Sequence, residues 1–66
     1  MTNEFREVLR YAENKKEAVV YQSGQNYFVE TWLNGKFNNM KKVDNLESAD
    51  MMAEGFIRSG PNLLVE

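Results

Sequence analysis

The middle of the chain has the residue pattern of β-strands. Residues 17–22, 26–33 and 36–43 are rich in β-branched and aromatic types, and turn-forming residues separate them. Asn34-Gly35 joins the last two segments and is a strong hairpin signal, because a type I′ turn needs φ > 0 at both central residues. The pattern therefore predicts three antiparallel strands.

The N-terminal segment, residues 3–14, has a helical period. Its apolar residues follow the i, i+3, i+4, i+7 spacing of one helix face and are Phe5, Val8, Leu9 and Ala12. Thr2 or Asn3 can cap this helix, and Asn14-Lys15-Lys16 would end it.

A second helical stripe follows the strands. Its apolar positions are Leu46, Ala49, Met52, Ala53, Phe56 and Ile57. Asp44 with Glu47 three residues later resembles a capping box, and Ser48 is an alternative cap. Gly55 inside the stripe suggests that another element packs closely against it.

These elements predict an α+β fold in the order α-β-β-β-α. The prediction is a three-stranded antiparallel sheet with two helices on one face. Residues 1–66 would form a single small domain, and Gly60-Pro61 would end the second helix. A short C-terminal tail, residues 59–66, would follow as a strand or a strap.

Composition removes several kinds of chemistry. The 66 residues include no cysteine and no histidine, so disulfides, the common zinc sites and Ser-His or Cys-His catalysis cannot be built. Asp44, Glu47 and Asp50 match no calcium loop. We expect no enzyme activity, no catalytic residue, no metal and no cofactor. No apolar run is long enough to span a membrane, and a cytoplasmic location is expected.

Two segments carry a resemblance to the double-stranded RNA-binding domain. Residues 27–36, YFVETWLNGK, resemble its second strand and turn, and residues 46–57, LESADMMAEGFI, resemble its second helix. The similarity covers residues 3–58 and lies in element order and packing pattern. It implies the α-β-β-β-α fold with the Tyr27 side of the sheet under the helices.

The basic motif of that family is missing. The family contacts RNA phosphates with a Lys-Lys-x-Ala-Lys cluster at the start of this helix. When the chain is aligned on Ala49, the three lysine positions hold Leu46, Glu47 and Asp50. Acids at a helix N-terminus repel phosphate, and the net charge of the chain is −2, so binding of duplex RNA is not expected.

Both faces of the predicted hairpin contain large apolar residues, because strand residues alternate between faces. One face carries Tyr27, Val29, Thr31, Leu33, Asn38 and Met40. The other carries Phe28, Glu30, Trp32, Phe37, Asn39, Lys41 and Val43. Counted from the Asn34-Gly35 loop, Glu30 faces Asn39 and Phe28 faces Lys41.

Three uses of the aromatic face are open. It can be the core under the helices, with Tyr27 and Thr31 pointing outward. It can be a binding interface for protein, formed by Phe28, Trp32, Phe37, Lys41 and Val43. It can also stack single-stranded bases, with the phosphates contacted by Lys36, Lys41 and Lys42.

We therefore expect a small binding module without enzyme activity that acts through protein–protein contact. It would be of an accessory or inhibitor type, as in small viral proteins, and would then act in the host cytoplasm. Self-association as a homodimer is expected, since a small core without disulfides gains from a second chain. The alternative is a nucleic-acid-binding domain that uses the aromatic face and nearby lysines, with single-stranded nucleic acid as partner. No membrane partner is expected.

Overall fold

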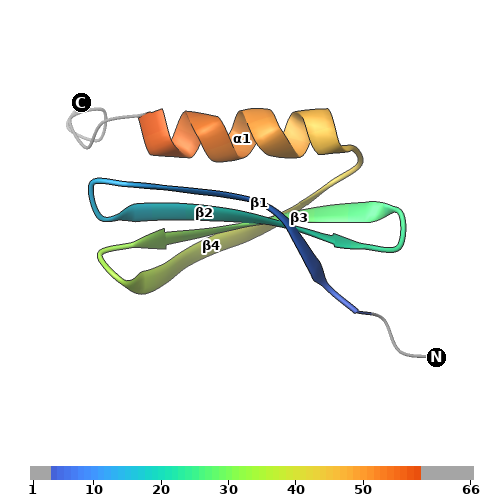
Figure 1. The fold of residues 1–66 in the computed structure, drawn as a ribbon, viewed down its shortest axis with the longest axis horizontal. Helices are drawn as coiled ribbons and strands as arrows, with labels where there is room; N and C mark the ends of the chain where they lie inside the picture. Colours follow the sequence, from blue (N-terminus) through green and yellow to red (C-terminus); the bar gives the residue numbers. More distant parts are fainter. Residues whose placement is uncertain (1–3, 59–66) are drawn as a thin grey trace.

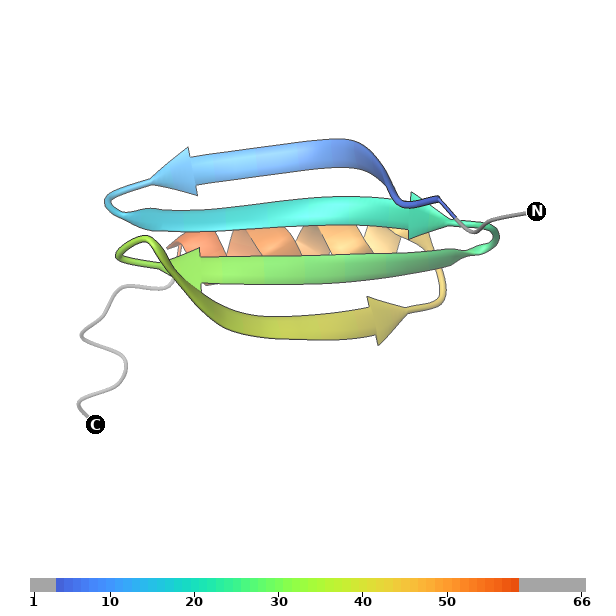
Figure 2. The ribbon, with the colours of Figure 1, turned by 90° about the horizontal axis from the view of Figure 1, so that it is seen from below.

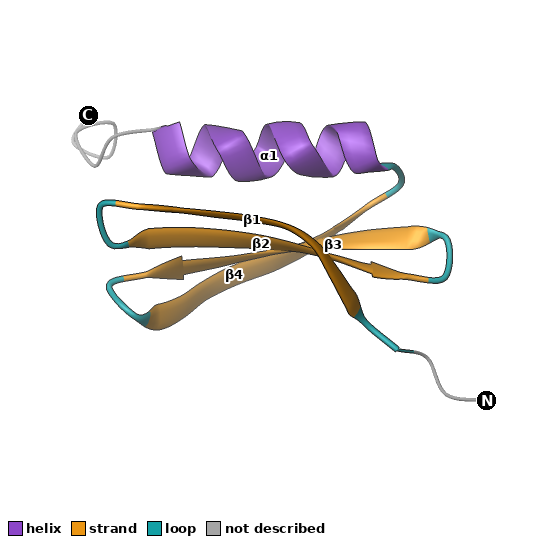
Figure 3. Cartoon of the chain, in the orientation of Figure 1, coloured by secondary structure: helices purple, strands orange, loops and turns teal. Residues whose placement is uncertain are grey.

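Four strands and one helix form two layers in the computed structural model, which describes residues 4–58 (Figure 1). The elements are β1 (Arg6–Glu13), β2 (Lys16–Ser23), β3 (Asn26–Leu33), β4 (Lys36–Val43) and α1 (Leu46–Arg58). The antiparallel sheet has the order β1-β2-β3-β4, and α1 lies on one of its faces (Figure 3). A small α+β domain is thus confirmed. The expected helix end at Gly60-Pro61 and the tail lie outside the described residues.

The N-terminal segment is a strand and not a helix, so the predicted α-β-β-β-α order with three strands and two helices is wrong. The observed order is β-β-β-β-α. A bulge in β1 shifts the register between Glu7 and Leu9, and the adjacent residues Val8 and Leu9 both pack against the core. A strand that turns two neighbouring residues inward imitates the i, i+3, i+4 spacing of a helix.

All three hairpins close with two-residue loops. The predicted turn is confirmed, since φ is 55° at Asn34 and 80° at Gly35. The loop between β1 and β2 has the same left-handed geometry, with φ of 52° at Asn14 and 67° at Lys15. The helix end predicted at Asn14-Lys15-Lys16 is therefore wrong, and lysine at φ > 0 is uncommon, which conceals this turn in the sequence. The two loops lie at the same end of the sheet, where the Asn34 N–H donates to the Lys15 carbonyl at 2.8 Å.

The core lies between α1 and the two central strands. Its fully buried residues are Ala18, Val20, Val29, Ala49 and Ala53. Alanines on both the sheet and the helix let the two layers approach closely. Larger side chains close the rim of this core and are Val8, Leu9, Tyr11, Tyr27, Val43, Met52, Phe56 and Ile57.

Polar contacts fix the helix on the sheet. The N-cap is Asn45, and not Asp44 or Ser48, because its Oδ1 accepts the Ser48 N–H at 2.8 Å. Near the other end of α1, the Lys16 Nζ donates to the Phe56 carbonyl at 3.2 Å and lies 5.5 Å from the centre of the Phe56 ring. A lysine at that position also interacts favourably with the helix dipole.

The helix covers the Tyr27 face of the sheet. Val29 is 1% exposed and Thr31 is 7% exposed beneath it, and Tyr27 packs against the core. The possibility that the Phe28 and Trp32 face is the core under the helix is therefore wrong. The aromatic face lies on the opposite side of the sheet.

Gly55 does not mark a close approach. A Cβ built on it meets nothing within 4 Å, since the residue lies on the outer side of α1.

We expect Gly55→Ala to raise the free energy of unfolding by about 1 kcal/mol, because alanine restricts the unfolded chain and favours the helix. Thermal unfolding measures this gain. The reverse substitution at the buried position, Ala53→Gly, serves as the matched control and should destabilise. A lower melting temperature for Gly55→Ala would contradict the open environment.

Candidate functional site

The face of the sheet opposite α1 is called the open face here, because none of the described elements covers it (Figure 2). The strand register arranges its side chains in three rows that run from β1 to β4. The first row, nearest the Asn34-Gly35 loop, is Ala12, Glu17, Trp32 and Phe37. The second row is Arg10, Val19, Glu30 and Met40. The third row is Glu7, Tyr21, Phe28 and Lys42.

A bulge in β4 decides which of its residues belong to the open face. The register shifts between Thr31 and Trp32, so Met40 pairs with Glu30 and Lys42 pairs with Phe28. The expected pairs, Glu30 with Asn39 and Phe28 with Lys41, are therefore wrong by one residue. Such a slip moves every later side chain of the strand to the other face.

Side-chain hydrogen bonds hold this bulge. The Asn38 amide donates to the Thr31 Oγ1 at 3.1 Å, and the Thr31 hydroxyl donates to the Asn39 carbonyl at 3.2 Å. The adjacent Asn38 and Asn39, which are poor strand formers, were the only signal of this irregularity in the sequence.

The structure divides the predicted binding residues between the two faces. Those on the open face are Phe28, Trp32, Phe37 and Lys42. Lys41 pairs with Val29 and Val43 pairs with Tyr27, so both lie on the helix side, where Val43 packs against the core. Lys36 pairs with Leu33 on that side as well. The three lysines therefore do not form one patch.

Aromatic side chains gather at two places on the open face. In the first row, the rings of Trp32 and Phe37 meet edge to face with centroids 5.7 Å apart. Beyond the third row, the ring of Phe5 lies 5.1 Å from Phe28 and 6.4 Å from Tyr21. Sequence reading missed Phe5, because it was assigned to the inner side of a helix.

Within residues 4–58, six large apolar side chains are exposed: Phe5, Phe37 and Met40 on the open face, and Leu33, Leu46 and Met51 elsewhere. Phe37 is 56% exposed, Phe5 is 52% exposed and Met40 is 41% exposed. A shallow hollow of about 240 Å³ lies between the side chains of Phe5, Tyr21, Glu30 and Met40. The open face thus offers apolar contact area to water, which is typical of a binding surface.

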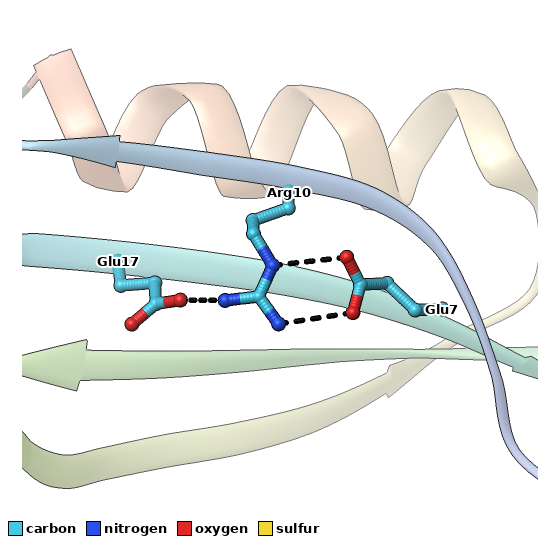
Figure 4. Close-up of polar contacts among 3 residues, drawn as sticks. All are labelled: Glu7, Arg10 and Glu17. Atoms are coloured by element: carbon cyan, nitrogen blue, oxygen red, sulfur yellow. Dashed lines mark hydrogen bonds and ion pairs between the residues drawn. The ribbon is translucent and has the colours of Figure 1, made fainter.

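An ion-pair triad lies at the β1 side of the open face (Figure 4). The Arg10 guanidinium donates from Nε and from a terminal nitrogen to the two carboxylate oxygens of Glu7, both at 2.9 Å. Its other terminal nitrogen donates to Glu17 on β2. This fork geometry orients all three side chains, and the hydrogen bond from Arg10 lowers the pKa of Glu7.

Charged and aromatic side chains shield the centre of the open face. Val19 is only 2% exposed although no helix lies over it. It lines a hollow together with Arg10, Glu17, Tyr21, Glu30 and Trp32. The three acids in the rows of the open face exceed the two cations there, Arg10 and Lys42.

Within residues 4–58, no group of three or more acidic side chains is placed to hold a metal ion. Over the same range, no helix is long and apolar enough to cross a bilayer.

The phenol of Tyr21 reports on the electrostatics of this face. Burial raises the pKa of Tyr21, and the neighbouring Glu30 carboxylate raises this pKa further by its charge and by a hydrogen bond. A raised tyrosine pKa means that the folded state resists ionisation. This contribution to stability is complete below about pH 10 and is lost as the pH rises through the folded-state pKa.

We therefore expect Glu30→Gln to lower the pKa of Tyr21, since it removes the negative charge and keeps the shape. A spectrophotometric titration of the tyrosinate band measures the change. Glu47→Gln, the same substitution on α1, is the control and should leave the curve in place. Identical curves for Glu30→Gln and the unaltered protein would contradict the contact.

No family model, curated protein or solved structure matches this chain. A proposal for its function therefore rests on the residues of the open face.

Proposed function

We propose that this chain is a binding module without enzyme activity that recognises another protein through the open face. The observation that carries the proposal is the exposure of Phe5, Phe37 and Met40 on a sheet face that no described element covers. Exposed apolar patches often mark a protein interface, and aromatic residues and methionine are enriched in such interfaces.

The arrangement of polar groups supports the same function. Apolar anchors lie at both ends of the open face, and the Glu7–Arg10–Glu17 triad lies beside them. Arg10 is already oriented by its two carboxylates, so a partner would find a fixed pattern of charge. Charges fixed in this way give specificity, while the aromatic anchors supply most of the affinity.

Crosslinking from the open face tests this proposal. A photoreactive phenylalanine analogue at Phe37 should form protein adducts in the purified chain or in an extract of the source cells. The control position is Met51, which is 66% exposed on α1 and so equally reachable. Adducts at position 37 that disappear with Trp32→Ser support the proposal. Equal yields at both positions, or no protein adduct at position 37, would overturn it.

Nucleic acid is the second candidate, and one contact favours it. Phe28 pairs with Lys42 across β3 and β4, so a base could stack on the ring while the ammonium contacts phosphate. The acids Glu7, Glu17 and Glu30 share this face and would repel the phosphate backbone. A protein partner is therefore preferred.

A titration with labelled single-stranded DNA and duplex RNA at low salt separates the two candidates. We expect no saturable binding to either, because acids outnumber cations in the rows of the open face. Binding that weakens steeply with added salt and is lost in Lys42→Ala, but not in Lys41→Ala, would favour nucleic acid instead.

A further inference from the structure

We propose that the protein bound at the open face is a second copy of this chain, stacked face to face about a two-fold axis parallel to the strands. This inference rests on the proposed function of the open face as a protein interface. The support comes from the order of charges and side-chain sizes within the three rows.

An axis parallel to the strands places each row opposite itself in reversed order, so β1 of one copy faces β4 of the other. In the third row, Glu7 then faces Lys42 of the second copy, and Tyr21 faces Phe28. In the first row, the small side chain of Ala12 faces the exposed ring of Phe37. Opposite charges meet, and a small residue accommodates a large one.

A two-fold axis in the plane of the sheet but perpendicular to the strands would bring like charges together. It places the second row on itself, so Arg10 meets Arg10 and Glu30 meets Glu30. Two pairs of like charges in a closed interface are destabilising. The charge pattern therefore selects the axis parallel to the strands.

The ion-pair triad supplies a further reason. Glu7, Arg10 and Glu17 together carry one excess negative charge. Lys42 forms no ion pair within residues 4–58. In the proposed dimer, Lys42 of one copy reaches the triad of the other and makes the cluster neutral, as charges at an interface require. In the second row of this dimer, Arg10 faces Met40 and Glu30 faces Val19 of the other copy, so no like charges meet there.

The available area fits a specific but modest contact. Each strand has 8 residues, which span about 26 Å, and four strands at a spacing of about 4.8 Å give a face of about 500 Å². Two such faces bury about 1,000 Å² in total, which is near the lower limit for a specific interface. The dimer should therefore dissociate on dilution.

Light scattering over a concentration series tests whether the chain forms a dimer. We expect a dimer for the unaltered chain and a dissociation constant at least about tenfold weaker for Lys42→Glu, because the introduced carboxylate would then face the carboxylate of Glu7. Lys41→Glu is the matched control. It changes the same charge at the neighbouring residue, which lies on the helix side, and should leave the dimer intact.

A mixture of two weakened variants tests the orientation. Glu7→Lys alone should also weaken the dimer, because two ammonium groups would meet. Mixing Glu7→Lys with Lys42→Glu should restore a dimer that contains one copy of each. Each parent dimer has like charges at both contacts, whereas both contacts of the mixed dimer join a lysine to a glutamate. A variant that had merely unfolded would not be rescued in this way, and circular dichroism of each single variant checks the fold.

Three results would overturn the inference: a monomer at every concentration, equal weakening by Lys41→Glu and Lys42→Glu, or no mixed dimer. The proposed function, binding of a protein at the open face, can hold even if the dimer does not form. If the chain is a monomer but position 37 crosslinks to a different protein, the open face is an interface for that protein. If position 37 crosslinks to nothing, both the inference and the proposed function fail.

Discussion

The described fold is governed by one constraint: a single 13-residue helix covers only one face of a four-stranded sheet. The hydrophobic effect is satisfied on that face, where alanines of α1 lie directly against Ala18, Val20 and Val29. The opposite face has no second layer among the described residues. Its side chains must shield their own backbone and one another, or be covered by another chain.

On the open face, aromatic rings, aliphatic stems and charged groups together cover the sheet. The aliphatic stem of Arg10 and the rings of Tyr21 and Trp32 lie around Val19, which they keep nearly as buried as the core. The carboxylates and the guanidinium keep the same surface hydrated. Phe5, Phe37 and Met40 are left beyond this arrangement, so their exposure is not explained by the stability of a single chain.

The sequence predicts the elements correctly where the strands and the helix are regular. It does not predict the elements or faces where a strand contains a bulge. The residue patterns predicted β2, β3, β4, the Asn34-Gly35 turn and the stripe of α1, and these are confirmed. Both failures have the same cause. The bulge near Val8 made β1 resemble a helix, and the bulge at Asn38 reversed the faces of Met40, Lys41, Lys42 and Val43. A bulge depends on the paired strand and on contacts such as Thr31 with Asn38, which neither period nor composition encodes.

The two bulges also bear on how a second chain could approach. Both lie in the edge strands, β1 and β4, where they interrupt the regular row of backbone groups that an added strand would need. The edge strand β4 also carries Lys36, Lys41 and Lys42, and lysines on an edge discourage pairing with another sheet. Growth of the sheet sideways is thus opposed at both edges. The face that holds Phe5, Phe28, Trp32 and Phe37 offers side chains and not unpaired backbone groups to a second chain, so stacking over this face is the association that we propose.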